Sequence, residues 1–130
     1  MKKDNMNDLR IAYVDFWPAF EQDEDIFTPL LSKYFNVIID NENPDVVFHS
    51  IFNGQRNIHK YNKVKKILLL GENYRPSQFK SDYSISFDPH SDTNYRLPLW
   101  QYYLILNPLL KEKLFNQEIK NIPVHHVLKK

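Results

Sequence analysis

The segment that most constrains the fold is residues 65–70, KKILLL, in which four apolar residues follow one another without interruption. A strand with one face in water alternates apolar and polar residues, whereas a strand covered on both faces is apolar throughout. The run therefore predicts an inner strand of a parallel sheet. It ends in Gly71-Glu72-Asn73, so a carboxylate directly follows the buried strand. In open α/β sheets, ligands bind beyond the carboxyl ends of the strands.

Other segments of the chain continue this pattern. Short apolar runs predict four further strands, at residues 9–14, 36–40, 45–52 and 82–87. Apolar residues recur at helical spacing over residues 21–35, where Thr28-Pro29 suits an N-cap and first helical position, or Pro29 lies in the first turn of a slightly earlier helix. They recur more weakly over 55–63, and again over 99–106 and 108–119. Alternating strands and helices predict an α/β fold, with a mainly parallel sheet of about five strands flanked by helices. We expect a single Rossmann-like domain over residues 1–130.

Composition excludes several classes of function. A net charge of +1 gives no field that would attract nucleic acid, and the chain has no cysteine for disulfides or thiolate chemistry. No apolar run is long enough to span a membrane and no signal region begins the chain, so we expect a cytoplasmic protein. With only two glycines and no phosphate-binding loop motif, the chain would not hold the phosphates of a nucleotide in a glycine-rich loop.

Polar and aromatic residues gather where the predicted strands end. They are Asp15 and Trp17 after the first strand, His49 and Asn53 at the third, Glu72, Asn73 and Arg75 after the fourth, and Asp88 and His90 after the fifth. Carboxylates, amides and flat rings together suit a sugar, which presents hydroxyls at its rim and C–H groups on its faces. The sequence therefore points to a carbohydrate site at this edge of the sheet.

Each of these candidates also has a purely structural interpretation. Glu72 can cap a turn or pair with Arg75, Asp15 can cap a turn, and Trp17 can cover the edge of the core. His49 lies within a strand, where a packed core histidine is the favoured interpretation. Asp88 precedes Pro89, which is a turn signal. These alternatives stay open at the level of sequence.

Two further motifs have simple explanations. Arg96 precedes Leu97-Pro98, where pairing with a carboxylate to anchor the loop is as reasonable as ligand binding. The letters of Asp23-Glu24-Asp25 fit a metal-binding Asp-x-Asp motif, but acids before a helical pattern favour helix capping. His125 and His126 lie in a tail without periodicity. We therefore expect no metal site.

At Glu72 the residues resemble a known family. The segments Gly71-Glu72-Asn73, residues 82–88 (DYSISFD) and residues 96–100 (RLPLW) stand in the order found in the amino-terminal half of α-1,3-fucosyltransferases of glycosyltransferase family 10, especially bacterial members. Residues 14–17 (VDFW) look like the first strand of that family. The resemblance covers about residues 10–103 and is most specific from 66 to 100.

This resemblance implies one half of a GT-B architecture. In that family the amino-terminal domain serves the acceptor sugar, the carboxy-terminal domain binds GDP-fucose, and the Gly-Glu-Asn glutamate is the proposed general base, a role that falls here on Glu72. Arg96 and Asp88 are expected to bind ligand or to hold the loops. The residues expected to contact the glycan acceptor are Asp15, Trp17, Asn53, Asn73 and Arg75.

The chain also departs from the family pattern. Ser86 stands where the family often has glycine, and the later segments that handle the nucleotide sugar have no match. We therefore expect residues 1–130 to lack the donor-binding domain and to be inactive alone. GDP-fucose would need a second domain, and the open cleft would bind that domain or a second copy of the chain. The alternatives are a non-catalytic glycan-binding or regulatory module and an unrelated flavodoxin-like interaction domain.

Overall fold

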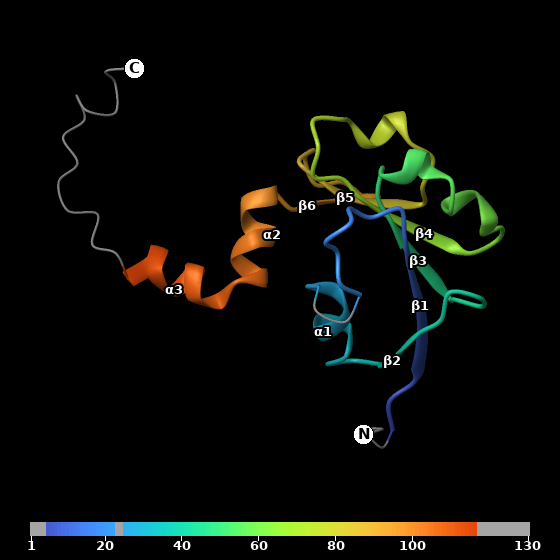
Figure 1. Cartoon of the computed structure of the whole chain (residues 1–130), viewed down its shortest axis with the longest axis horizontal. Helices are drawn as coiled ribbons and strands as arrows, with labels where there is room; N and C mark the ends of the chain where they lie inside the picture. Colours follow the sequence, from blue (N-terminus) through green and yellow to red (C-terminus); the bar gives the residue numbers. More distant parts are fainter. Residues whose placement is uncertain (1–4, 23–24, 117–130) are drawn as a thin grey trace.

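The computed structural model describes residues 5–22 and 25–116, which form one sheet with helices and turns on both faces (Figure 1). Across these residues six strands pair in the order β2-β1-β3-β4-β5-β6, and each pair is parallel. The strands are β1 (Asp8–Val14), β2 (Asn36–Ile39), β3 (Val46–His49), β4 (Lys65–Leu69), β5 (Tyr83–Ser86) and β6 (Asn94–Arg96). The predicted parallel α/β sheet is confirmed, with β4 inside it, but the predicted number of strands is wrong.

The additional strand is β6, at the edge of the sheet. Its sequence, Asn-Tyr-Arg, has no apolar alternation, so periodicity does not reveal it. Its register pairs Asn94 with Ser84 of β5. The Asn94 amide oxygen accepts hydrogen bonds from the hydroxyls of Ser84 and Ser86, each at 2.7 Å. The side chains that link β6 to β5 are therefore polar, whereas neighbouring strands are usually linked by apolar side chains.

The helices differ more from the sequence prediction than the strands do. They are α1 (Phe27–Leu31), α2 (Leu99–Leu106) and α3 (Pro108–Asn116), and short 3₁₀ turns occur at η1 (Asn53–Gln55), η2 (Ile58–Lys60) and η3 (Pro76–Gln78). The prediction for residues 99–106 is confirmed. The helix predicted from residue 108 is seen to residue 116, and the rest of that prediction lies outside the described residues.

Two predicted helices differ from the structure, one in its length and the other in its existence. The helix predicted within residues 21–35 is present as α1, with Pro29 in its first turn as one of the two predicted starts requires, but it is short and ends at Leu31. The Asp25 carboxylate accepts hydrogen bonds from the backbone N–H groups of Phe27 (2.5 Å) and Thr28 (3.1 Å) at the start of this helix. Residues 55–63 form 3₁₀ turns instead of an α-helix. Gly54 and Gln55 have φ angles of 60° and 56°, and these left-handed conformations interrupt a helix.

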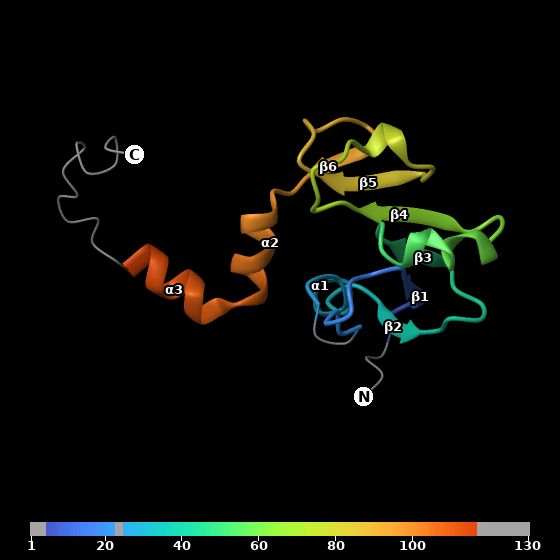
Figure 2. The ribbon, with the colours of Figure 1, turned by 45° about the horizontal axis from the view of Figure 1, so that its top comes forward.

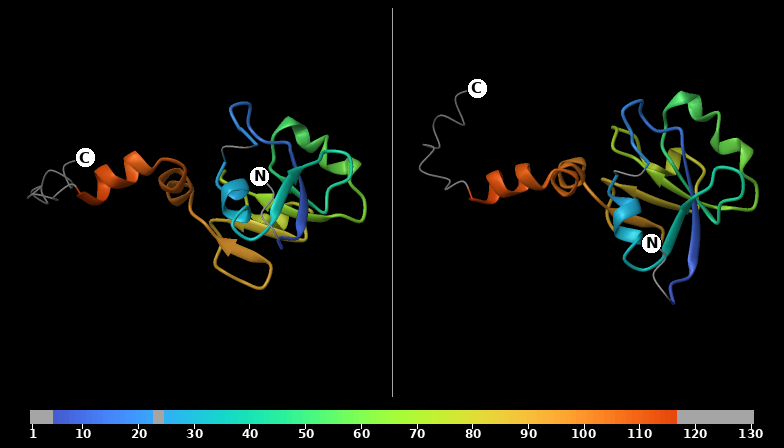
Figure 3. Two further views of the ribbon diagram at one scale, coloured as in Figure 1. Left: turned by 90° about the horizontal axis from the view of Figure 1, so that it is seen from below. Right: turned by 60° about the horizontal axis from the view of Figure 1, so that its bottom comes forward.

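Alternate residues of the central strands build a core on each face of the sheet. On one face, Ile11 and Tyr13 of β1 pack with Phe27 of α1 and Tyr102 of α2. On the other face, Ala12 of the same strand packs with Val47 and with Ile58 of η2. Figure 3 shows α1 and the 3₁₀ turns on opposite sides of the strands. Both faces of the inner strands are thus covered, as the apolar run in β4 predicts.

Helices α2 and α3 lead away from the sheet (Figures 1 and 2). Tyr102 is 2% exposed and fixes α2 to the core beside Trp17 and Phe27. Several apolar side chains of the two helices face solvent, among them Trp100, which is 61% exposed, and Leu109, which is 71% exposed. An apolar surface of this kind marks a place where another part of a protein packs.

His49 of β3 is a packed core histidine, as predicted. Its side chain is fully buried, and Nε2 lies 3.0 Å from the Ser81 hydroxyl oxygen. That hydroxyl donates to the Lys66 carbonyl oxygen, so Nε2 carries the proton and donates to Ser81. Among the described residues, Nδ1 has no hydrogen-bond partner. Burial lowers the pKa of His49 from 6.5 to about 4, which keeps the ring neutral.

We predict that His49 makes the protein less stable in acid. The unfolded chain takes up a proton below pH 6.5 that the folded chain binds only near pH 4. The free energy of unfolding should therefore fall between these values by up to ~1.4 kcal/mol per pH unit. Urea unfolding from pH 4 to 7.5 measures this slope. His49→Gln should flatten it relative to wild type, while His59→Gln, at an exposed histidine, should not; equal slopes in all three proteins would contradict the assignment.

Candidate functional site

The residues predicted from sequence to form the site follow strands that end at one edge of the sheet. All strand pairs of the described region are parallel, so their carboxyl ends face the same way. The segments leaving this edge carry Asp15 and Trp17 after β1, Asn53 after β3, Glu72, Asn73 and Arg75 after β4, Asp88 after β5, and Arg96 as the last residue of β6. The topology therefore brings residues from Asp15 to Arg96, which are far apart in the sequence, to one edge of the sheet.

Glu72 lies in an exposed bend directly beyond the buried end of β4. Leu69 and Leu70 are 6% and 1% exposed, whereas Glu72 and Asn73 both face solvent. The Tyr74 N–H donates to the Glu72 carbonyl oxygen at 2.8 Å, which closes the turn through the backbone. The Glu72 carboxylate makes no hydrogen bond or ion pair to any residue that the structure describes. The pairing with Arg75 considered above is therefore not present.

Arg75 pairs instead with Asp88. Its Nη1 lies 2.5 Å from Asp88 Oδ1, and its backbone N–H donates to Gln78 Oε1 at 2.7 Å. The pair joins the loop after β4 to the end of β5. Because the Arg75 side chain is largely in water, the pair contributes no more than about 1 kcal/mol to stability. Its main effect is to hold the segment between Glu72 and η3 near β5.

Gly71 allows β4 to pass close beneath the start of α2. A Cβ atom at this position would lie 2.9 Å from Leu99 Cδ1, which is closer than van der Waals contact permits. A larger residue at this position requires the tip of the Leu99 side chain to move, and the turn that carries Glu72 leaves the strand next to the start of α2. Among the three residues Gly71-Glu72-Asn73, the packing of Leu99 therefore bears on the size of the residue at position 71.

Asp15 is a buried residue that holds the η2 turn. It is 3% exposed, and its Oδ2 accepts hydrogen bonds from the backbone N–H groups of Asn57 (3.1 Å) and Ile58 (3.0 Å). Its Oδ1 accepts from the Asn57 side-chain amide at 2.9 Å. These contacts correspond to the structural alternative given above. Contact with an acceptor stays a prediction for Asp15, and its internal bonds favour a role in positioning the loop.

Trp17 belongs to an aromatic cluster and also borders a hollow. Its ring centroid lies 5.3 to 6.0 Å from those of Phe16, Phe20, Phe52 and Tyr102. The half-buried ring lines a hollow of about 280 Å³ with Tyr102, Leu106 and the acidic residues Glu21 and Asp25. Trp17 thus covers the core edge and still presents part of its ring to a space at the strand ends.

Among the remaining candidates, two side chains are exposed without hydrogen bonds to the described residues and one holds a loop. Asn53 and Asn73 are exposed, with no side-chain hydrogen bond to the described part of the chain. Arg96 anchors its loop by donating to the Phe87 carbonyl oxygen, so the anchoring role is present but the expected carboxylate partner is wrong.

The structure favours capping over metal binding for the acidic triplet. Asp25 caps α1 as described above, while Asp23 and Glu24 lie outside the described residues. No group of three metal-ligating side chains occurs within residues 5–22 and 25–116, and His125 and His126 lie beyond them.

A cluster that the sequence prediction missed lies on β5 and β6. Ser84, Ser86 and Asn94 are at most 8% exposed and hydrogen bond to one another. The available signal was the pattern Tyr-Ser-Ile-Ser in β5, which places hydroxyls where a parallel strand usually carries aliphatic side chains.

Comparison with known proteins places this geometry in a family. The model of the α-(1,3)-fucosyltransferase FucT N-terminal domain matches residues 11–103, which is well over half of the chain. The chain belongs to this family. Comparison with curated proteins gives no match. No helix among the described residues has the length and apolar character needed to cross a membrane.

Solved structures of α1,3-fucosyltransferases share the fold. One superposes with a TM-score of 0.63 at 23% identity over 99% of this chain. Others, described as complexes with GDP-fucose and with GDP, give TM-scores of 0.57 and 0.60 at 21% and 23% identity over 98% of this chain. The chain spans 37–39% of the length of these enzymes. It therefore corresponds in fold to less than half of each.

We predict that Gly71→Ala destabilises this fucosyltransferase domain through Leu99. The obstructing atom is the tip of the flexible Leu99 side chain, which can move aside, so the free energy of unfolding should fall by less than about 1 kcal/mol. Adding Leu99→Ala removes the obstructing methyl groups, so the double variant should be more stable than the sum of the two single effects. Urea unfolding of the four proteins measures this coupling. Additive effects would show that the contact with Leu99 does not cause the loss of stability.

For Asp15 we predict a loss of stability that a ligand residue would not show. Asp15→Asn replaces one acceptor oxygen with an NH₂ group that faces backbone donors, so the free energy of unfolding should fall by about 2 kcal/mol. Asp92→Asn, at an exposed position, is the matched control and should change stability little. Thermal and urea unfolding measure both. Full stability of Asp15→Asn would exclude the capping role.

Proposed function

We propose that this chain is the acceptor-side domain of an inverting α-1,3-fucosyltransferase and that Glu72 is its general base. One observation carries the proposal: in a domain of this family, Glu72 places a carboxylate just beyond an inner strand, and this carboxylate has no partner among the residues that the structure describes. The neighbouring polar residues Asp15, Arg75 and Asp88 are already engaged in internal contacts. Glu72 is therefore the carboxylate at this edge that is best placed to accept a proton from a ligand.

The chemistry that this role requires is simple. A hydroxyl of the acceptor glycan attacks the anomeric carbon of fucose, and the bond from that carbon to the GDP phosphate breaks on the opposite face, which inverts the configuration. Glu72 accepts the hydroxyl proton as the new C–O bond forms. General-base catalysis of this kind contributes about 10²- to 10⁴-fold in rate. Holding the two sugars in line accounts for much of the remaining acceleration.

Several residues of the same edge are suited to hold the acceptor. Trp17 offers an aromatic face for the C–H surface of a sugar ring, and Asn53 and Asn73 offer amides that have no other partner in the described region. Arg75 and Asp88 restrain the Glu72 loop through their ion pair. In this proposal the exposed groups bind the glycan, and the paired groups keep the base in position.

The donor requires more protein than these 130 residues. Two of the structural relatives are described as complexes with GDP-fucose or GDP, and this chain spans less than two-fifths of either. We propose a GT-B arrangement in which a second domain binds GDP-fucose and packs near α2 and α3. The exposed apolar residues Trp100, Ile105 and Leu109 support such a contact. Without that domain the chain does not transfer fucose, and the same surface favours self-association.

The test combines transfer with acceptor binding. In a fusion with the donor-binding half of an α1,3-fucosyltransferase, Glu72→Gln should lower the rate of fucose transfer to N-acetyllactosamine by at least about 100-fold. The affinity of the isolated chain for N-acetyllactosamine, measured by NMR titration, should change much less. Glu42→Gln, at an exposed glutamate that follows β2 and lies three strands away from β4, is the matched control and should leave both unchanged.

Three results would contradict parts of the proposal. Unchanged transfer by the Glu72→Gln fusion would exclude Glu72 as the base. Transfer of fucose by residues 1–130 alone would remove the need for a second domain. If the folded wild-type fusion binds both GDP-fucose and the glycan but transfers no fucose, the result would favour the non-catalytic glycan-binding module.

A further inference from the structure

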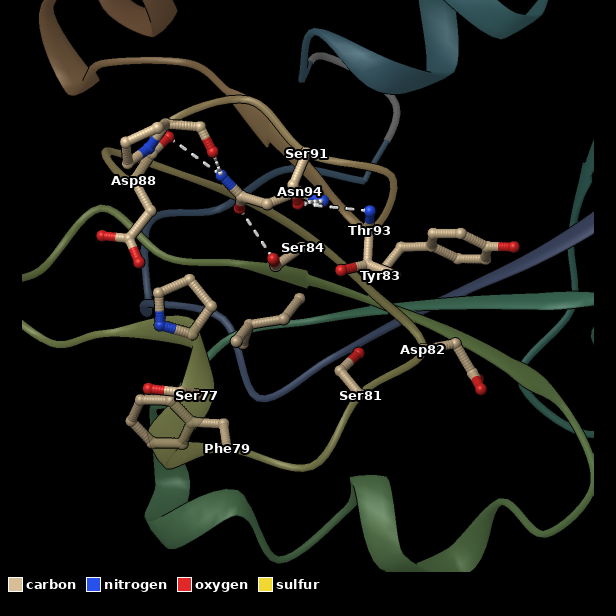
Figure 4. A pocket seen from close by; sticks show the side chains of 13 residues that line it. Ser77, Phe79, Ser81, Asp82, Tyr83, Ser84, Asp88, Ser91, Thr93 and Asn94 are labelled. Atoms are coloured by element: carbon tan, nitrogen blue, oxygen red, sulfur yellow. Dashed lines mark hydrogen bonds between the residues drawn. The ribbon is translucent and has the colours of Figure 1, made fainter.

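A second hollow lies on a face of the sheet, apart from the turn that carries Glu72. Its volume is about 380 Å³, and it lies over β4, β5 and β6 between the η3 segment and the loop of residues 87–93 (Figure 4). The register pairs Leu68 with Ser84 and Ser84 with Asn94, so these three side chains form its floor. We call this space the β5–β6 hollow. Glu72 does not line it.

The β5–β6 hollow exists because the connections between these strands are short. Parallel strands are usually joined by a helix that covers the sheet face. Here the connection from β4 to β5 contains only the 3₁₀ turn η3, and residues 87–93, which join β5 to β6, contain no helix. The face over β5 and β6 is therefore left partly open, although β1 and β3 are covered on the same side by Ile58 of η2.

Apart from Leu68, the floor of the hollow is polar, and hydrogen bonds hold it rigidly. The hydroxyls of Ser84 and Ser86 donate to the Asn94 amide oxygen, and the Asn94 NH₂ group donates to the carbonyl oxygens of Asp88 (2.9 Å) and Pro89 (3.1 Å). All four hydrogen-bonding positions of the Asn94 amide are thus occupied. The Ser84 hydroxyl keeps lone pairs that can accept a further hydrogen bond. A floor of this kind favours a polar occupant over an apolar one.

The walls supply further polar groups and an apolar surface. Ser77 and Thr93 are exposed, and their hydroxyls form no hydrogen bond within the described ranges. Asp82 and Asp88 stand at opposite ends, with the Ser84–Asn94 bond between them (Figure 4). One oxygen of each is engaged, by the Lys66 N–H and by Arg75, so the other remains available. The ring of Phe79 lies beside Ser77.

We infer that the β5–β6 hollow is a binding site for a neutral carbohydrate. Its volume falls in the range of ~300–1,000 Å³ that is usual for small-molecule sites. None of its described lining residues is Lys, Arg or His, and the two carboxylates disfavour a phosphate or another anion. Hydroxyls and carboxylate oxygens match the rim of a pyranose, while Phe79 and Leu68 match its C–H faces. The inference does not depend on whether Glu72 is a base.

An NMR titration of the isotope-labelled chain tests this site directly. The probes are glucose, galactose, fucose, N-acetylglucosamine and lactose, with inorganic phosphate as the anionic control. We expect at least one sugar, and not phosphate, to shift the amide signals of Ser77, Ser84 and Thr93 in a saturable manner. Ser77→Trp fills the hollow from an exposed position and should weaken this binding at least tenfold. Asp92→Trp, next to the hollow but not lining it, should leave it unchanged.

The outcomes separate this site from the proposed catalytic one. Glu72→Gln should leave the shifts at the hollow intact, so loss of fucose transfer and loss of this binding are independent results. The inference is wrong if no sugar shifts these signals, if phosphate shifts them instead, or if Ser77→Trp leaves sugar binding unaltered while the variant's spectrum shows a folded protein. Shifts confined to Trp17, Glu72 and Asn73 would support the proposed acceptor site and reject the hollow.

Discussion

The parallel pairing of β1, β3 and β4 is the constraint on which the rest of this structure depends. Its register aligns the partly buried Val14 with His49, and His49 with Leu68, and the last two side chains are fully buried at the centre of the sheet. Because these strands all run in one direction, their last residues reach the same edge. The position of the turn that carries Glu72 is therefore set by the sheet. The residues of the turn itself determine only that the carboxylate is exposed.

The short connections of the sheet determine how its polar residues are used. The chain has little length between strands in which to form helices, so side-chain hydrogen bonds hold several of the loops. Asp15 holds η2, Arg75 holds the segment before η3 against Asp88, and Arg96 holds residue 87. The side chains that make no such contact in the described part of the chain, above all Glu72, are those that we propose for ligand binding. The same shortness leaves the β5–β6 hollow open on one face.

Agreement between sequence and structure is best where apolar pattern and burial coincide. The strands β1, β3 and β4 and the helix α2 are predicted from the sequence because their buried side chains follow the apolar pattern of a strand or of a helix. The helix predicted within residues 21–35 is present but short, and the Asp25 carboxylate caps its start by accepting hydrogen bonds from Phe27 and Thr28. The strand β6 is missed because the side chain that accompanies its pairing is the amide of Asn94. Polar contacts of this kind leave no periodic signal.

The amino-acid sequence by itself determined the parallel α/β class, the family resemblance around Gly71-Glu72-Asn73 and the edge of the sheet that carries the candidate residues. It left each of those residues with two interpretations. Only the tertiary structure decided that Asp15 bonds to Asn57, 42 residues away, and that Arg75 pairs with Asp88 and not with Glu72. The physical reason is that a polar side chain is either free or engaged according to partners that folding brings from distant segments.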